Sequence, residues 1–191
     1  NQALNFYKAQ KLFKDRNISF NRPAMHMVFT GNPGTAKTTV ARLFAQIMKE
    51  NGLLSKGDLY EVGRADLVGK YVGHTAPLVR QAFKKARGSV LFIDEAYSLV
   101  EKEGLYGDEA INTIVQEMEN KRDDIIVIFA GYPNEMEKFL SKNPGLHSRI
   151  AFHIPFEDYS SDELCDIAKK IASSRGLSLS NDAVHKLDGI F

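Results

Sequence analysis

GNPGTAKTT, residues 31–39, is the most informative segment of this 191-residue sequence. It follows the apolar run MHMVFT at 25–30 and leads directly into an amphipathic stretch. Glycines allow a tight loop whose backbone N–H groups point at an anion, and the start of a helix adds free N–H groups and a positive end. The order of apolar run, glycine loop and helix therefore predicts a phosphate-binding site.

Two side chains carry the expected chemistry of this loop. Lys37 is placed to reach the β- and γ-phosphates of a nucleotide, and the hydroxyl of Thr38 is placed to hold Mg²⁺. The predicted nucleotide-binding residues are Gly31, Asn32, Pro33, Gly34, Thr35, Ala36, Lys37, Thr38 and Thr39.

Ala36 departs from the general pattern GxxxxGK[ST], which has a second glycine at this position. The added methyl group could weaken nucleotide binding, or be tolerated if the backbone φ angle stays negative. The alternative interpretation of the whole stretch is a plain glycine turn. Its position between a predicted strand and a predicted helix favours the nucleotide site.

Five short apolar runs alternate with amphipathic stretches, and we expect strands at 25–30, 58–62, 90–93, 125–130 and 150–154. The runs at 90–93 and 125–130 are apolar throughout, which is typical of parallel strands covered on both faces. Apolar residues recur at helical spacing at Val40, Leu43, Phe44, Ile47 and Met48, at Leu78, Val79, Ala82, Phe83 and Ala86, and at Ile111, Ile114, Val115 and Met118. The alternation predicts an α/β fold with a parallel five-stranded sheet sandwiched by helices.

The pattern changes after the fifth run. PFEDYS at 155–160 is rich in turn residues, and Ser160 with Glu163 forms a capping box that opens a helix. Gly176 ends that helix, and another helical pattern follows Ser180 and reaches the end of the sequence. We predict an α/β nucleotide-binding core over residues 1–158 and the start of a small, truncated helical domain over residues 159–191.

Composition excludes several classes of protein. The 43% hydrophobic and 26% charged residues are ordinary for a soluble globular domain, and no apolar run is long enough to span a membrane. A net charge of +1 gives no overall field that attracts nucleic acid or an anionic membrane. Cys165 is the one cysteine, so no internal disulfide forms, which fits a reducing, cytoplasmic location.

Asp94 and Glu95 end the run at 90–93, at the carboxyl edge of the expected sheet, where α/β proteins bind ligands. A carboxylate there can hold Mg²⁺, so Thr38 and Asp94 are the two predicted metal ligands. The next carboxylate, Glu95, can orient and deprotonate an attacking water. Two solvated acids at a loop start are the alternative, and the preceding phosphate loop favours hydrolysis.

GNPGTAKT and VLFIDEA resemble the phosphate-loop and acidic-strand motifs of the AAA+ ATPases, in the same order. The resemblance implies a P-loop NTPase fold, ATP as the nucleotide and a helical lid at residues 159–191. It also implies a homo-oligomeric ring, which we expect to be a hexamer. It runs from about residue 3 to about residue 180. It is closest to the subgroup of stage V sporulation protein K and the red-type Rubisco activases, on stretches such as GRADLVGKYVGHTAP, GDEAINTIVQEME and NPGLHSRIAFHIPF, with the sporulation type favoured.

The resemblance assigns three further roles. Lys70, Tyr71, Val72 and Gly73 match the pore loop that grips substrate chains, whereas the alternative is a surface turn whose Tyr71 covers the core. Arg149 matches the arginine finger that acts on a neighbouring subunit's site. Asn134 is the candidate for the γ-phosphate sensor, because Ala130-Gly131-Tyr132 has no Asn where many relatives have one.

Together these features predict an ATP-hydrolysing ring protein that pulls on or remodels an unidentified protein substrate. One alternative is a scaffold whose assembly is set by ATP binding with little hydrolysis, which Ala36 favours and Glu95 disfavours. A second is a remodeller of the Rubisco-activase type. A nucleic-acid motor is disfavoured by the near-neutral charge, so we expect no specific nucleic-acid partner.

Overall fold

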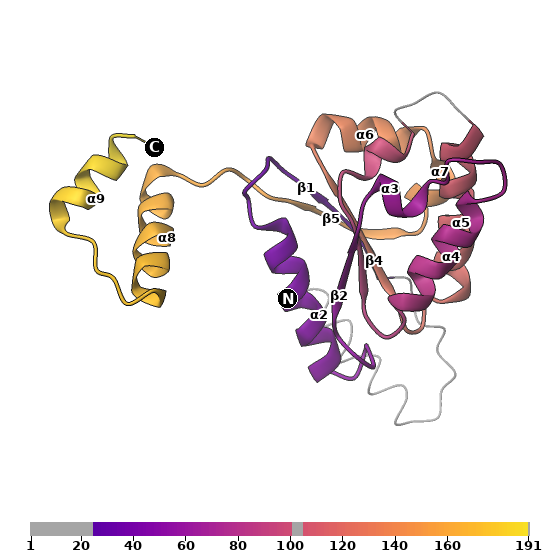
Figure 1. The fold of residues 1–191 in the computed structure, drawn as a ribbon, viewed down its shortest axis with the longest axis horizontal. Helices are drawn as coiled ribbons and strands as arrows, with labels where there is room; N and C mark the ends of the chain where they lie inside the picture. Colours follow the sequence, from indigo (N-terminus) through magenta and orange to yellow (C-terminus); the bar gives the residue numbers. More distant parts are fainter. Residues whose placement is uncertain (1–24, 101–104, 191) are drawn as a thin grey trace.

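A computed structural model describes residues 25–100 and 105–190 and contains one parallel sheet in the order β2-β3-β4-β1-β5 (Figure 1). The strands are β1 His26–Thr30, β2 Leu59–Val62, β3 Val90–Ile93, β4 Ile126–Gly131 and β5 Ile150–Pro155. Each predicted apolar run is a strand, with bounds that shift by about one residue, as is usual at element ends. The predicted fold class is confirmed.

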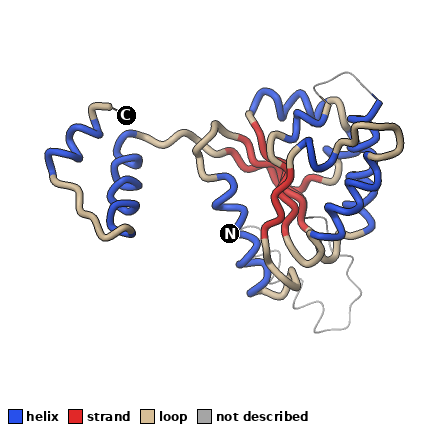
Figure 2. Tube along the Cα trace, viewed as in Figure 1, coloured by secondary structure: helices blue, strands red, loops and turns tan. Residues whose placement is uncertain are grey.

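Helices cover both faces of this sheet (Figure 2). The long ones are α2 Lys37–Glu50 on one face, and α4 Thr75–Lys85 and α5 Leu105–Asn120 on the other. Four shorter elements had not been predicted: α3 Arg64–Leu67, the 3₁₀ turn η1 Ala96–Leu99, α6 Pro133–Ser141 and α7 Pro144–His147. None of the described helices combines the length and the apolar character that crossing a membrane requires.

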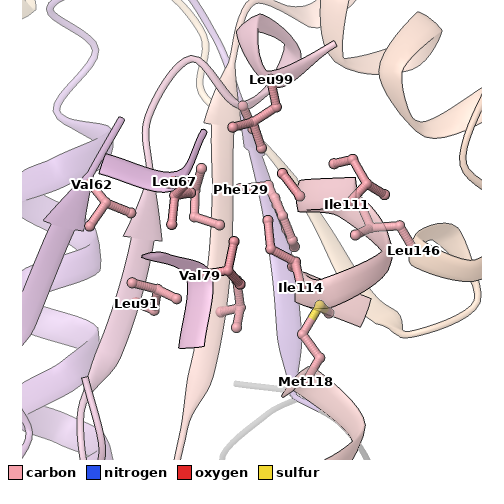
Figure 3. Close-up of a cluster of buried hydrophobic side chains, with 14 of the residues drawn as sticks. Val62, Leu67, Val79, Leu91, Leu99, Ile111, Ile114, Met118, Phe129 and Leu146 are labelled. Atoms are coloured by element: carbon pink, nitrogen blue, oxygen red, sulfur yellow. The ribbon is translucent and has the colours of Figure 1, made fainter. Parts of the chain in front are cut away.

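The larger core lies between the sheet and helices α4 and α5. Val79 of α4 and Ile114 of α5 pack among Leu91 of β3 and Phe129 of β4, and all four are fully buried (Figure 3). The apolar strands β3 and β4 alternate their side chains between this core and the smaller core under α2. Burial of each large side chain contributes roughly 1.5–3 kcal/mol.

The buried face of α2 differs from the predicted one. Val40, Leu43 and Ile47 are 39%, 54% and 43% exposed. The residues of α2 that are buried under the sheet are Ala41, Ala45 and Met48. The short alanine side chains let the helix lie close to the strands. Of the five apolar residues predicted to face the sheet, Met48 is buried and Phe44 partly buried, whereas Val40, Leu43 and Ile47 stay on the outer surface.

Beyond β5 the chain forms α8 Ser161–Ser174 and α9 Asn181–Asp188, which lie apart from the sheet in Figure 1. The predicted capping box is present: the Ser160 N–H donates to Glu163 at 2.9 Å, and the Glu163 N–H donates to the Ser160 hydroxyl at 3.4 Å. Cys165 is buried between these two helices, consistent with packing. The domain boundary at residue 158 stays a prediction.

His26, the first residue of β1, is a buried polar side chain in this fold. Its Nδ1 accepts the backbone N–H of Val127 at 3.0 Å, and the ring is 1% exposed. Burial is the main cause of the low pKa of His26, which falls from 6.5 to about 4; the Met118 backbone and the charge of Glu119 oppose the shift in part, and the nearby charge of Arg149 favours it. The imidazole is therefore neutral in the folded protein at neutral pH.

Acid should destabilise the fold through His26. Below pH 6.5 the unfolded chain binds a proton at this ring before the folded chain does, so stability is lost as the pH falls from 6.5 towards 4. The full loss is roughly 3 kcal/mol. Urea unfolding of the parent and of His26→Gln between pH 7.5 and 4.5 should show a parent that loses more stability than the variant. The exposed His153, changed to Gln, is the control. Parallel pH profiles of the parent and His26→Gln would contradict this account.

Candidate nucleotide site

The phosphate loop begins at a close contact between neighbouring strand ends. Gly31 follows β1, and its N–H donates to the carbonyl of Gly131 at 3.2 Å. On the other side the Phe156 N–H donates to the Thr30 carbonyl at 2.7 Å. A Cβ on residue 31 would lie 2.5 Å from the Phe156 carbonyl oxygen, so only glycine fits at this point.

Asn32 and Thr35 brace the loop from within. The Thr35 hydroxyl donates to the Asn32 carbonyl at 2.8 Å, and Thr35 is 5% exposed. The Asn32 side-chain amide donates to both carboxylate oxygens of Asp158, at 2.8 and 3.0 Å. These two residues therefore shape the loop and tie it to the segment after β5, although neither lines the cavity described next.

A cavity of about 460 Å³ opens at the carboxyl ends of β1, β3 and β4. Its lining residues are Gly31, Pro33, Gly34, Ala36, Lys37, Thr38, Thr39, Asp94, Glu95, Gly131 and Tyr132. The structure thus brings the predicted phosphate loop and the predicted acidic pair into one cavity. The sheet causes this meeting, because parallel strands place their following loops at a common edge.

Ala36 adopts a left-handed backbone, with φ of 62° and ψ of 23°. The condition under which its methyl group would be harmless, a negative φ, is not met. Ala36 is the N-cap of α2, and its carbonyl accepts the N–H of Val40 at 2.9 Å. For a residue with a Cβ this backbone conformation costs roughly 1–2 kcal/mol, which the surrounding loop must offset.

Lys37 begins α2 and bends back over the loop. Its ammonium group donates to the carbonyls of Gly31 at 2.9 Å and Asn32 at 2.8 Å. The positive side chain and the free N–H groups of the first turn of α2, which contains no acidic residue, face the same cavity. Both features favour a bound anion.

Asp94 and Glu95 lie at the end of β3. The Asp94 N–H continues the sheet by donating to Val62 at 3.0 Å, and its Oδ1 accepts the N–H of Glu95 at 3.0 Å. Glu95 has φ of 46° and ψ of 47° and is the N-cap of η1. Its carboxylate is exposed at the cavity, where it can contact a water or a substrate.

The cavity offers Mg²⁺ suitable oxygen ligands. Thr38 presents a hydroxyl and Asp94 a carboxylate, and Mg²⁺ prefers hard oxygen donors, commonly one or two carboxylates with phosphate oxygens and water. The residues therefore fit this ion. Over residues 25–100 and 105–190, no group of three or more His, Cys, Asp or Glu side chains could hold a metal by itself.

Gly131 and Tyr132 are cavity residues to which sequence reasoning gave no role. They end the apolar run of β4, at the same edge as Asp94, and that position was the available signal. A Cβ on Gly131 would lie 2.8 Å from the Tyr97 ring and 2.9 Å from the Met136 sulfur, so any other residue there would require these side chains to move. Asn134, the predicted sensor, is exposed on the first turn of α6, and the structure does not bring it to the cavity.

Arg149 lies at the amino ends of the strands, whereas the cavity lies at their carboxyl ends. It precedes β5, and Ile150 pairs with His26 at the amino end of β1. That end is roughly 13 Å along the strand from the end that carries the phosphate loop, at about 3.3 Å per residue. The Arg149 guanidinium contacts Glu119 at 3.3 Å and the Gly145 carbonyl at 2.9 Å.

The segment from Lys70 to Gly73 lies between the short helix α3 and α4. Tyr71 and Val72 are 68% and 84% exposed, so the alternative in which Tyr71 covers the core is wrong. The Tyr71 ring contacts only the edge of His74, at 5.5 Å between centroids, among the ring contacts of the described residues. Gly73 has φ of 78°, which lets the loop turn back.

Residues 27–158 match the ATPase family associated with various cellular activities (AAA). The chain belongs to this family of ATPases, whose members bind nucleotide.

Several named proteins are similar to this chain over most of its length. Protein CfxQ of Xanthobacter flavus is 53% identical over 87% of this chain and 53% of its own length. Stage V sporulation protein K of Bacillus subtilis (strain 168) is 51% identical over 91% and 54%. The chloroplastic ribulose bisphosphate carboxylase/oxygenase activase of Cyanidioschyzon merolae is 49% identical over 87% and 57%. The chain spans about half the length of these relatives.

A crystal structure of the FIGL-1 AAA domain in complex with ADP has the same fold, with a TM-score of 0.62. It covers 93% of this chain and 57% of its own, at 21% sequence identity. At this level of identity the likeness concerns the fold alone, and it agrees with the family assignment.

Ala36→Gly should stabilise the protein. Glycine adopts positive φ without the steric cost of a Cβ, and the gain should be about 0.5–1 kcal/mol after the greater freedom of an unfolded glycine is subtracted. Urea unfolding measures this difference. Ala168→Gly in the interior of α8 is the matched control and should destabilise by about 0.5–1 kcal/mol. Equal losses in the two variants would show that Ala36 is not strained.

Proposed function

We propose that this chain is the ATP-hydrolysing part of a ring-forming protein that pulls on or remodels a protein substrate. The observation that carries the proposal is the single cavity shared by the phosphate loop, with Lys37 and Thr38, and the acidic pair Asp94 and Glu95. Simple nucleotide binding needs only the loop. The second carboxylate, exposed beside it, is the group that hydrolysis requires.

In this proposal the loop N–H groups and Lys37 bind the phosphates of ATP. Thr38 and Asp94 would hold Mg²⁺, which would supply positive charge beside the phosphate groups when bound. Glu95 accepts a proton from the water that attacks the γ-phosphate. Its left-handed backbone supports this role, because strained backbone that the fold maintains is concentrated at functional positions.

Arg149 acts on a neighbouring subunit in this proposal. Its place at the opposite edge of the sheet keeps it from the phosphates of its own chain, whereas a ring brings the two edges of adjacent subunits together. The exposed apolar stripe Val40, Leu43 and Ile47, on the helix that begins at the phosphate loop, supports assembly, since such stripes are commonly covered by a partner. Hexamers are the ring size we expect.

The substrate we propose is an extended protein segment held by Tyr71. The exposed ring and Val72 lie beside an open groove of about 630 Å³ with Val68, Pro77 and Leu78 in its walls. An apolar groove with a projecting aromatic can contact any polypeptide without a defined sequence.

The charge of this region favours substrate segments that carry carboxylates. The only acidic residue between positions 64 and 88 is Asp66. Of the residues that line the groove, Lys70 is positively charged and none is acidic. The chain is 51% identical to a sporulation protein and 49% identical to a Rubisco activase, so sequence identity does not favour the substrate of either relative. The proposal therefore describes the substrate segment only by its chemistry.

Glu95→Gln and Arg149→Ala should each abolish turnover and yet complement each other. Glu95→Gln should retain ATP binding and lose about 10²-fold or more in rate, because the base is gone. Arg149→Ala should lose about 10³-fold. Co-assembled full-length subunits of the two kinds should recover activity, since an interface with an intact Glu95 can receive an intact Arg149.

The matching control is the double variant co-assembled with Arg149→Ala, which contains no Arg149 and should gain nothing. The rate per subunit of the parent should also rise with protein concentration. If the mixed subunits hydrolyse ATP no faster than either variant alone, the site is not shared between subunits. If the parent binds ATP tightly without hydrolysing it, the alternative of an ATP-dependent assembly scaffold is favoured.

Tyr71→Ala should separate hydrolysis from substrate binding. Basal ATP turnover should stay within about twofold, whereas binding of fluorescein-labelled casein, a disordered acidic protein, should weaken about tenfold or more, because an exposed aromatic anchor is lost. Fluorescence anisotropy measures the binding. Tyr71→Phe keeps the ring and should bind like the parent. Unchanged casein binding by Tyr71→Ala would exclude the loop as the grip.

A further inference from the structure

Arg64 connects two parts of the chain that the proposed function uses separately. It is the first residue of α3, directly after β2, and its side chain is half-buried. One guanidinium nitrogen, Nη1, donates to the carbonyl of Leu99 at 2.7 Å and also to the carbonyl of Ser98. Ser98 and Leu99 are the last residues of η1.

The turn η1 in turn holds the backbone of Glu95. The Ser98 N–H donates to the Glu95 carbonyl at 2.8 Å, so the turn closes directly onto this residue. Glu95 has a left-handed backbone, which only its surroundings can maintain. The position of the Glu95 carboxylate therefore depends on a turn whose end is fixed by Arg64.

On its other side, α3 is firmly joined to the loop that carries Tyr71. Leu67, the last residue of α3, is fully buried in the larger core. The base of the loop is closed by the Gly69 N–H, which donates to the buried Thr75 hydroxyl at 3.1 Å. A Cβ at Gly69 would lie 2.6 Å from the His74 Cβ, so the two ends of the loop lie against each other.

A second cavity, of about 550 Å³, lies between these parts. Its walls include Arg64, Asp66 and Ser98, and it shares Asp94 and Glu95 with the nucleotide cavity. Space on both sides of Glu95 permits its carboxylate to shift when η1 shifts. The contact of Arg64 with η1 is thus the direct polar link from α3 to the catalytic edge of the sheet.

We propose that Arg64 is a positioning residue that couples the loop carrying Tyr71 to the placement of the Glu95 carboxylate. The inference rests on the proposed function, in which Glu95 acts on water and Tyr71 grips substrate. Load on the loop moves α3, and Arg64 transmits that movement to the η1 carbonyls. Lysine is a poor replacement, because its compact ammonium lacks the rigid, planar set of donors of a guanidinium.

The test uses the full-length protein with Arg64→Lys, Arg64→Gln and, as matched control, Arg175→Lys at the exposed residue after α8. Val72, which is 84% exposed, is changed to Cys and labelled with a fluorophore that reports the conformation of the loop. Cys165 is changed to Ala in every variant, and any cysteine that the full-length protein has outside these 191 residues is changed to Ser. Fluorescence is compared between bound ADP and bound AMP-PNP, alongside kcat and KM for ATP and thermal unfolding.

In the control we expect a fluorescence difference between the two nucleotides equal to that of the parent. In Arg64→Lys and Arg64→Gln we expect at least half of that difference to be lost. Their kcat should fall by about 10- to 100-fold, with KM within about twofold and an unchanged unfolding temperature, because a misplaced base affects the reaction more than binding.

Loop fluorescence and kcat equal to the parent in both variants would overturn the inference. So would a fall in nucleotide affinity and unfolding temperature that accompanies the fall in kcat, because that pattern describes a structural residue. A parent without ATP turnover defeats the proposed function instead. The fluorescence comparison still decides the role of Arg64 in that case, since it requires only bound nucleotide.

Discussion

β1 pairs with β4 on one side and with β5 on the other, and this central placement determines where the phosphate loop starts. The chain leaves β1 through a narrow passage, with the Gly131 carbonyl on one side and the Phe156 backbone on the other. Because Gly31 has no Cβ, the strands can stay paired up to the point where the loop begins. The direction of the loop, the start of α2 and the cavity at the sheet edge all depend on that contact.

Backbone strain in the described part of the chain is concentrated at the cavity. Apart from glycines, only Ala36 and Glu95 have a positive φ there, and both line the cavity. One caps the helix that would bind phosphate, and the other carries the carboxylate proposed to act on water. Each conformation is held by neighbouring main-chain hydrogen bonds, in the first turn of α2 and in η1. The cost at each position is offset by the packing of the elements that follow it.

The functional groups occupy separate faces of one domain. The nucleotide cavity lies at the carboxyl edge of the sheet, Arg149 lies at the amino edge, and Tyr71 projects from the loop between α3 and α4. The geometry therefore suits an assembly, in which the edge of one subunit completes the cavity of the next, and it gives Arg64 a place as an internal connection.

Short-range patterns of residue type were enough to predict the five strands, the parallel sheet, the glycine loop and the acidic pair, because strand burial, glycine turns and helix caps are local. They also identified Ser160 and Glu163 as a cap. The remaining features depend on contacts between distant segments. The buried face of α2 depends on which side chains fit close to the strands, and periodicity cannot distinguish Ala41 and Ala45 from the bulkier Leu43 and Ile47 beside them.

Three further features arise only when distant segments are brought together. They are the positive φ of Ala36, the presence of Tyr132 and not Asn134 in the cavity, and the contact of Arg64 with the carbonyls of Ser98 and Leu99. Residue type predicts which elements form, because helical periodicity, caps and runs of apolar residues are local patterns. Which side chains then meet is decided by the pairing of strands that lie far apart in the chain.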